Sequence, residues 1–472
     1  MTSSSLHSIR WPGHPFLLGA VSLLVLFTGF YSNTWRASDE FLFEHHRIDT
    51  EGLVVGRIVQ SRHEGILSQG GFLGIGGTNG VPDPEAWMTF EFQYHAYTND
   101  LAFATFVTYR SQSGVQGMWF SALDRLPGIP ERHKLALYHG LNSLLAAGVL
   151  ALIVVWFHQE FGLVTALCVL VSTGACQWLP LLARNLYWSL WAFYLPMAVL
   201  LYHLHRTRPV TVRDYVRLGV VTFAALLLKC SLNGYEYITT TLVMLAVPVV
   251  YYGVAGGVSF PSLAAQMLAV SVASILAILL SASLLCAQIG AEQGGFSEGF
   301  EHLKTSYERR TRGNTEDFAP GLEARLQSSV GAVLLRYLKA TFLDLNHYVT
   351  SSHPFVSRIL LKVRYTHLIG LLCLTSGWYA WYLRRHLSGP DRVRVRALVW
   401  TAWFSLLGPL SWFVVFKAHS IVHARINSIV WQMPFTLFGF ALVGLVLDLT
   451  VRRLLGRRTT GRAKHVSAEF TG

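Results

Sequence analysis

Apolar residues gather into about ten stretches along this chain, and polar or charged residues separate them. A stretch of about 20 apolar residues is long enough to cross the roughly 30 Å of hydrocarbon in a bilayer. The pattern therefore predicts an all-α polytopic membrane protein with about ten transmembrane helices. The predicted spans are 15–32, 136–157, 161–179, 186–204, 215–232, 236–254, 263–288, 366–383, 397–416 and 428–450.

The composition supports a membrane protein. Hydrophobic residues make up 52% of the chain and charged residues 14%, whereas soluble domains carry about a quarter charged residues. The sequence contains no Walker A, G-x-S-x-G or H-E-x-x-H motif, which argues against an ATP-driven pump and a membrane serine hydrolase. Its five cysteines have no metal-binding or disulfide spacing. The first span is long for a signal-peptide core and no A-x-A site follows it, so we expect an uncleaved helix.

The basic residues predict the orientation. The net charge is +12, from 38 Lys and Arg against 26 Asp and Glu. Arginines cluster after the fourth and eighth spans and in the C-terminal tail, which all fall on one side when ten spans are threaded. By the positive-inside rule, this side is cytoplasmic and the topology is N-in/C-in. We expect one multispan membrane domain over 1–456, followed by a basic cytoplasmic tail over 457–472.

Two long polar segments, 33–135 and 289–365, then become large extracytoplasmic loops. In the first, "GGFLGIGGTNG" predicts a mobile, turn-rich loop, because no strand and helix flank it as they flank a phosphate-binding loop. The stretches "WMTFEFQYHAYTND" and "LAFATFVTYRSQ" alternate enough to predict a short strand or an interfacial helix.

The densest group of charges, "WRASDEFLFEHHRID", follows the first span directly. One interpretation is a solvated loop beside the membrane. The other is a carboxylate that takes the proton from a hydroxyl group at the membrane surface. The second interpretation makes Asp39 or Glu40 the base, with Asp39 favoured, and places Glu44 and His45 beside the substrate.

A basic group, "FKAHSIVHARIN", precedes the last span. His419 and His423 are four residues apart and share a helix face, a spacing that also suits zinc, but no third ligand is evident and we expect no metal. Several cationic donors at the level of the lipid headgroups suit a phosphate better. This interpretation assigns phosphate binding to Lys417, His419, His423 and Arg425; the alternative is simple anchoring at the interface.

Three further stretches carry polar residues at outer helix ends, where we expect contacts to substrate. "LLKCSLNGYEYITT" holds Lys229 and Glu236, which are as compatible with a structural ion pair as with a substrate contact. "ARNLYWSLW" holds Arg184 and Tyr187, for which an interfacial aromatic belt is the alternative. "YRSQSGVQG" holds Arg110 in a polar loop that suits sugar hydroxyls.

This combination resembles the GT-C glycosyltransferases, multispan enzymes that use a polyprenyl-phosphate-linked sugar on the outer side of the membrane. The resemblance rests on "SDE" at the start of the first outer loop, "KAHSIVHARIN" before the last span, and "YERRTRGN" in the second outer loop. It departs from the oligosaccharyltransferases, since no W-W-D motif and no large soluble C-terminal domain follow the spans. Protein N-glycosylation is therefore not expected.

The resemblance implies an inverting glycosyltransferase in a bacterial inner (cytoplasmic) membrane, with its active site facing the periplasm or exterior. Asp39 or Glu40 would deprotonate a hydroxyl acceptor on a glycan, a lipid or a cell-envelope polymer. The basic group would stabilise the leaving polyprenyl phosphate. No cofactor is expected, although a divalent metal is compatible with the chemistry, and the partners are membrane lipid, donor and acceptor without nucleic acid.

Three alternatives compete with this reading. An O-antigen-type polysaccharide polymerase or ligase also uses lipid-linked sugars, and donors of one or of many sugars would distinguish it. A lipid or glycolipid transporter or flippase would favour paired halves with charges at the bilayer midplane, which the sequence does not have. The third is a non-catalytic assembly protein, which the facing acidic and basic groups make less attractive.

Overall fold

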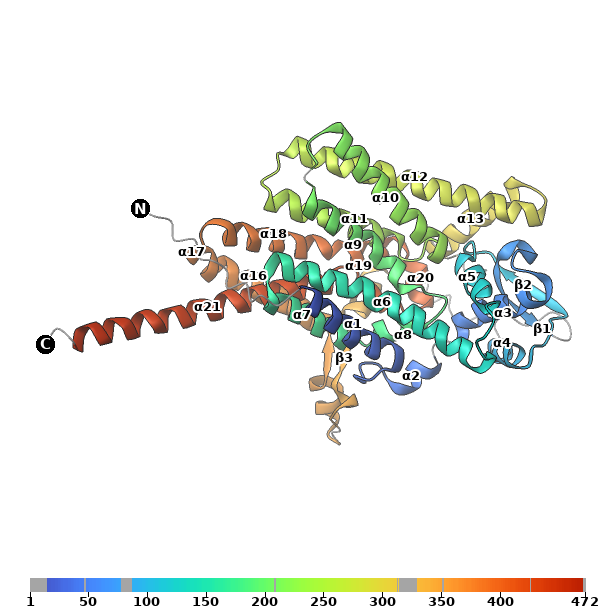
Figure 1. Ribbon diagram of the computed structural model, residues 1–472, viewed down its shortest axis with the longest axis horizontal. Coiled ribbons are helices and arrows are strands. Elements are labelled where there is room, and N and C mark those ends of the chain that lie inside the picture. Colours follow the sequence, from blue (N-terminus) through green and yellow to red (C-terminus); the bar gives the residue numbers. More distant parts are fainter. Residues whose placement is uncertain are drawn as a thin grey trace.

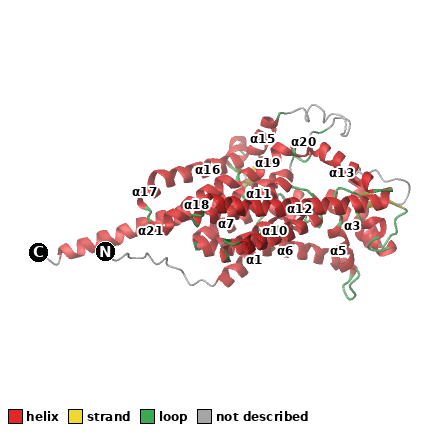
Figure 2. Ribbon diagram, turned by 90° about the horizontal axis from the view of Figure 1, so that it is seen from above, coloured by secondary structure: helices red, strands yellow, loops and turns green. Residues whose placement is uncertain are grey.

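The computed structural model describes residues 15–45, 48–77, 87–207, 209–311, 313, 329–349, 352–424 and 426–469. Helices dominate this part of the chain, and the strands are short (Figure 2). All ten apolar stretches are occupied by helices. These are α1 (Pro15–Ser32), α6 (Glu131–Phe161), α7 (Leu163–Ala175), α8 (Trp178–Arg184), α9 (Leu190–Arg206), α10 (Val212–Asn233), α11 (Ile238–Ala255), α12 (Phe260–Gln293), α16 (Tyr365–Trp378), α18 (Gly389–Ser405), α19 (Leu407–Val415) and α21 (Phe435–Glu469).

The long apolar helices define an integral membrane protein. Within the described residues, seven helices are long and apolar enough to cross a bilayer, and an eighth span forms if the bent pair α7 and α8 counts as one. The remaining stretches are shorter: α9 has 17 residues, and α16 has 14 before it continues through a π-helical turn, Tyr379–Leu383. The predicted all-α polytopic class is confirmed, whereas the count of ten spans and the orientation stay predictions.

Helices α7 and α8 are bent by 74°, and the chain between them bonds to other parts of the molecule. The side chain of Gln177 donates a hydrogen bond to the Thr341 carbonyl oxygen at 2.5 Å, and its backbone N–H donates to Phe342 at 3.2 Å. The hydroxyl group of Ser38 donates to the Gln177 carbonyl. These bonds tie the break to residues 341–342 and to the chain just after α1.

The first polar segment folds into a small unit at one end of the helix bundle (Figure 1). It contains α2 (Glu40–His45), α3 (Ile48–Glu64), a 3₁₀ turn (Ser68–Gly71), β1 (Leu73–Gly77), α4 (Trp87–Asn99), β2 (Thr105–Tyr109) and α5 (Val115–Asp124). Strands β1 and β2 pair antiparallel, with Leu73 opposite Tyr109. The two stretches for which a short strand or an interfacial helix is expected form α4 and β2, and the interfacial position of α4 stays a prediction.

The prediction of a mobile loop over "GGFLGIGGTNG" is wrong for its first half, because Leu73–Gly77 forms the largely buried strand β1. The glycines allow close packing rather than motion. A Cβ atom on Gly56 of α3 would lie 2.3 Å from the Gly74 carbonyl oxygen, so helix and strand touch backbone to backbone. The residues from 78 onward in this stretch lie outside the described residues.

The second polar segment and the last connection complete this end. They comprise α13 (Phe296–Thr311), α15 (Val330–Leu338), β3 (Thr341–Asp344), a 3₁₀ turn (Leu345–His347), a π turn (Val356–Leu360), β4 (Lys362–Arg364), α17 (Arg384–His386), α20 (Lys417–Val422) and a 3₁₀ helix (Ile426–Gln432). Strands β3 and β4 pair antiparallel. Helix α13 packs against α20, although more than a hundred residues separate them in sequence (Figure 1).

The bundle therefore has two distinct ends. The start of α1 and the last turns of α21 lie at one, which we name the terminal end; α2 to α5 and α13 lie at the other, the loop end (Figure 1). Helix α6 runs through the middle and packs against α1, α7 and α9. Its buried face contributes Trp156 and Phe157 to one large apolar core.

A buried network attaches the first polar segment to α6. The Asp124 carboxylate accepts hydrogen bonds from Arg62 at 2.6 and 3.0 Å, from Tyr97 at 2.8 Å and from Tyr138 of α6 at 3.0 Å. Burial alone would raise the pKa of Asp124, but its hydrogen bonds to Arg62 and Tyr97 hold that pKa below the ordinary value. We name this the Asp124 network.

Candidate functional site

The turn between α10 and α11 holds a buried carboxylate at the loop end. Glu236 is 5% exposed. Gly234 and Tyr237, on either side of it, have positive φ angles of 54° and 52°, so the chain reverses within a few residues. The Lys229 ammonium group of α10 donates hydrogen bonds to the carbonyl oxygens of Gly234 at 3.0 Å and of Glu236 at 2.6 Å. Lys229 therefore fixes the turn that presents Glu236.

The Glu236 side chain meets basic residues from two distant segments. Arg310, near the end of α13, places Nη2 3.0 Å from Oε1 of Glu236. His419 of α20 places Nε2 3.3 Å from Oε2. All three side chains are at least 88% buried, with exposed fractions of 12%, 6% and 10% for Arg310, Glu236 and His419. We name Lys229, Glu236, Arg310 and His419 the Glu236 cluster.

Aromatic side chains border the Glu236 cluster. Tyr187, in the α8–α9 connection, donates a hydrogen bond from its hydroxyl group to that of Tyr109 in β2 at 3.2 Å. Tyr109 in turn is hydrogen-bonded to Arg310. On the other side, the His419 ring lies 4.6 Å from the His423 ring, centroid to centroid. The first polar segment thus contributes to the same site as α13 and α20.

Electrostatics give this cluster an excess of positive charge. Burial alone would raise the pKa of Glu236, but the Arg310 guanidinium group holds it below the ordinary value. Burial lowers the pKa of His419 to about 3, so its imidazole is neutral at pH 7 and its contact with Glu236 is not an ion pair there. Two cations then accompany one carboxylate: Arg310 contacts it, and Lys229 is bonded to the backbone of the turn that carries it. A buried excess charge is costly unless an anion balances it.

Several buried polar atoms around the cluster have no hydrogen-bond partner within the described residues. They are Arg110 Nε, Gln112 Nε2 and Oε1, Asn233 Oδ1, Glu236 Oε2 and Tyr237 Oη. Gln112 adjoins the α10–α11 turn, since a Cβ atom on Gly234 would lie 3.1 Å from the Gln112 Cβ atom. Native proteins pair nearly all such groups, so unpaired ones gathered beside an excess charge are typical of a binding site.

The acids predicted as the base lie in a second group, around α2. Asp39 caps this helix: its Oδ1 atom accepts a hydrogen bond from the Leu42 N–H at 3.0 Å. Glu40 is exposed in the first turn. Glu44 forms an ion pair with Arg184 at 3.3 Å, and the exposed His45 bonds through Nδ1 to the Phe41 carbonyl at 2.9 Å.

The α8–α9 connection links the two groups. Arg184 contacts Glu44 of α2, and Tyr187 contacts Tyr109, which is bonded to Arg310. The Cα atoms of Arg184 and Tyr187 are at most about 10 Å apart, because only three residue steps separate them. Between them, the Leu186 N–H donates to Glu51 at 3.0 Å. Glu51 is fully buried and also meets His139 of α6 at 2.8 Å. No contact joins Asp39 directly to the Glu236 cluster within the described residues.

The structure thus brings together Lys229, Glu236 and His419 of the predicted site residues, with Tyr187 and His423 at their border. Arg110 lies nearby, where its backbone is hydrogen-bonded to His302 of α13. Lys417 is half-buried and makes no ion pair within the described residues. Arg425 lies outside the described residues.

Sequence reasoning missed Arg310, Tyr109, Glu51 and His139. "YERRTRGN" was recognised as a basic stretch, but nothing in it distinguishes Arg310 from Arg309. A helical projection of 296–311 offers a partial signal, since Gly299, Leu303 and Arg310 fall near one face of that helix. Glu51 and His139 are 88 residues apart and carry no local motif.

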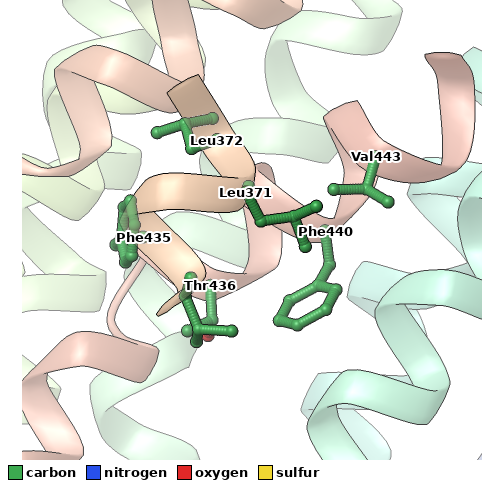
Figure 3. Close-up of a pocket in the computed structure, with 8 residues that line it drawn as sticks. Leu371, Leu372, Phe435, Thr436, Phe440 and Val443 are labelled. Atoms are coloured by element: carbon green, nitrogen blue, oxygen red, sulfur yellow. The ribbon is translucent and has the colours of Figure 1, made fainter. Parts of the chain in front are cut away.

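A narrow apolar groove of about 10 Å³ lies between α16 and α21 (Figure 3). Leu372, Phe435 and Phe440 line it, and Thr436 is its one hydroxyl-bearing side chain. The lining of the groove is apolar, and its volume is about that of one water-sized probe, so the groove has no room for a ligand.

The fold and site together define an integral membrane protein with a buried, cation-rich cluster at the loop end. Comparison with known proteins adds no relative: no family model, no curated protein and no solved structure matches the chain.

Proposed function

We propose that the protein is a membrane glycosyltransferase of the GT-C type. It transfers a sugar from a polyprenyl-phosphate donor to a hydroxyl acceptor at the loop end, which is the extracytoplasmic side in the predicted topology. The observation that carries the proposal is the Glu236 cluster, whose buried excess of positive charge beside unpaired polar atoms suits a phosphate.

In this proposal the phosphate of the donor binds at Arg310, with His419 as a neutral hydrogen-bond donor. Arg310 is suited to this role because its planar guanidinium group can bond two phosphate oxygens at once. The acceptor hydroxyl attacks the anomeric carbon, the bond from that carbon to the phosphate oxygen breaks, and polyprenyl phosphate leaves. Developing charge on the phosphate is stabilised by the cations already in place.

Asp39 is the proposed base that takes the hydroxyl proton. Its Oδ1 atom is held by the Leu42 N–H, while Oδ2 has no hydrogen-bond partner within the described residues. This geometry fixes the carboxylate and leaves one oxygen for a proton. Glu40, the next residue, is exposed, and its side chain is less constrained than that of Asp39.

Binding of undecaprenyl phosphate to the full-length protein in nanodiscs tests the phosphate site. We expect Arg310→Gln to weaken binding at least about tenfold, because it removes a buried charged partner. The matched control is Arg336→Gln, an exposed arginine of α15, which should bind as the wild type does. Undecaprenol, which lacks the phosphate, should not distinguish Arg310→Gln from wild type. Equal binding of the phosphate by both arginine variants would contradict the proposal.

Transfer itself is tested with a panel of undecaprenyl-phosphate-linked monosaccharides and alcohol acceptors, by measuring release of undecaprenyl phosphate. Asp39→Asn should abolish release while leaving undecaprenyl phosphate binding intact, and Glu40→Gln is the neighbouring control. Retained transfer by Asp39→Asn would remove Asp39 from the mechanism. Movement of the lipid across the bilayer without release of undecaprenyl phosphate would favour a flippase instead.

A further inference from the structure

A second cavity opens at the terminal end, far from the Glu236 cluster. It lies between the α9–α10 and α11–α12 connections and has a volume of about 290 Å³. Small-ligand pockets begin at about 300 Å³, so the space fits a glycerol-sized group with its nearest substituents. Leu204 and Val258 give it an apolar side, and Ser259, Ser262 and Gln266 give it a polar side.

Among the residues that line the cavity, Gln266 of α12 is the buried one whose polar side chain has no partner within the described residues. Its side chain lines the cavity and the residue is only 3% exposed. No hydrogen bond involves either atom of its amide group within the described residues. The neighbouring polar groups differ: the Tyr252 hydroxyl donates to Glu160 at 2.8 Å and accepts from Trp156 at 2.8 Å, and Ser262 bonds to Tyr215 at 3.2 Å.

The walls of this cavity are held in place without a ligand. In the α9–α10 connection, the Asp214 carboxylate accepts hydrogen bonds from the backbone N–H groups of Val210 at 3.4 Å and Thr211 at 3.1 Å. In the α11–α12 connection, the Val258 N–H donates to the Gly253 carbonyl at 3.0 Å. The cavity is therefore preformed, and the Gln266 amide, which no protein group bonds within the described residues, is available to a ligand there.

The lining identifies the chemistry of that ligand. Among the described residues, no Lys, Arg, Asp or Glu lines the cavity, so the groups that these residues offer a ligand are uncharged hydrogen-bonding groups and apolar surface. An amide and several hydroxyl groups beside apolar side chains suit hydroxyl and ester groups on a short carbon frame. The cavity also lies where three candidate spans, α10, α11 and α12, have an end, and the glycerol region of a lipid likewise lies at the boundary of the hydrocarbon core.

We propose that this cavity binds the uncharged glycerol or glyceryl-ester part of a neutral lipid, with the Gln266 amide hydrogen-bonding to its hydroxyl or carbonyl oxygens. The site lies at the end opposite the Glu236 cluster and does not depend on the function proposed for that cluster. A free polyol offers the same hydroxyl chemistry, so the test separates the two sources.

The test measures saturable binding to the full-length protein in phosphatidylcholine nanodiscs, with radiolabelled dioleoylglycerol in one arm and free glycerol in the other. We expect Gln266→Leu to weaken dioleoylglycerol binding about tenfold, through loss of the amide hydrogen bonds. The matched control is Ser274→Ala, a buried position two turns further along α12 that does not line the cavity. It should bind as wild type does.

Each outcome decides the proposal. Saturable dioleoylglycerol binding that Gln266→Leu weakens supports a lipid ligand, and the same result for glycerol alone supports a free polyol. Equal binding by wild type and Gln266→Leu in both arms, or no saturable binding in either, overturns the site. If Gln266→Leu does not fold, Val258→Trp is used instead, because it fills the cavity from the α11–α12 connection. This variant must also weaken dioleoylglycerol binding.

Discussion

Asp124 and Glu236 are both buried carboxylates at the loop end, yet their surroundings differ. The Asp124 network is complete: two arginine nitrogens and two tyrosine hydroxyls reach the carboxylate, and Arg62 and Lys134 are balanced by Asp124 and Glu131. Glu236 has two cations around one acid, and its Oε2 atom lacks a hydrogen bond within the described residues. The balanced network holds two parts of the fold together, whereas the unbalanced one suits a charged ligand.

The largest effect should come from breaking the balanced network. Asp124→Asn leaves Arg62 buried without its main partner and should lower the free energy of unfolding by about 3–5 kcal/mol. Thermal unfolding in detergent, followed by circular dichroism, measures this loss. The double variant Arg62→Met/Asp124→Leu should recover part of it, because it removes both charges. A single variant as stable as wild type would refute the structural role.

A smaller effect is expected at the unbalanced cluster, and it concerns binding. Glu236→Gln removes the anion that competes with a phosphate for Arg310, so the affinity for undecaprenyl phosphate should rise about tenfold. Asp124→Asn, in any preparation that stays folded, should leave this affinity unchanged. Weaker binding by Glu236→Gln would mean that the carboxylate holds Arg310 in place rather than competing for it.

A smaller effect is expected in the pH dependence of the free energy of unfolding, to which both acids contribute. Both have folded pKa values below their ordinary values, 3.8 for Asp124 and 4.5 for Glu236. Each therefore stabilises the fold above its ordinary pKa, and this contribution is lost as the pH falls through the lower folded value. Unfolding measured from pH 6 to pH 3 should show wild type and Glu236→Gln converging at the acidic end. A constant difference would contradict the assignment.

The smallest effect is expected for the exposed pair beside α2. Glu44→Gln removes the ion pair with Arg184, whose glutamate side chain is 47% exposed. Exposed pairs of this kind contribute between about 0 and 1 kcal/mol. Thermal unfolding should therefore differ little from wild type. A loss comparable to that of Asp124→Asn would show that the α2 group is more than a surface contact.

Much of the fold could be predicted from sequence because apolar length is a local property. Each of the ten stretches contains helix, from α1 to α21. The α7–α8 break and the buried strand β1 are not predicted, and both involve contacts between distant parts of the chain. The break between α7 and α8 is hydrogen-bonded to the carbonyl group of Thr341, more than 160 residues away, and the burial of β1 depends on glycines that accept another backbone.

The site shows the same division. Glu236 and Lys229 could be singled out because charges inside or beside an apolar stretch are conspicuous. The sequence offered no means to pair Glu236 with Arg310 and His419, since those pairings depend on how α13 and α20 pack. Asp39 was assigned from its place after the first span, and its role as the cap of α2 emerges only from the backbone.

The order in which the Glu236 cluster is encoded has a consequence during synthesis. Lys229 and Glu236 leave the ribosome with α10 and α11, whereas Arg310 and His419 follow 74 and 183 residues after Glu236 (310 − 236 and 419 − 236). A nascent chain that has reached residue 300 holds this carboxylate in the turn after α10 with Lys229 but without Arg310 and His419. Premature termination before residue 310 would therefore leave the acid without the basic side chains that contact it, a feature by which quality-control machinery could distinguish an incomplete chain.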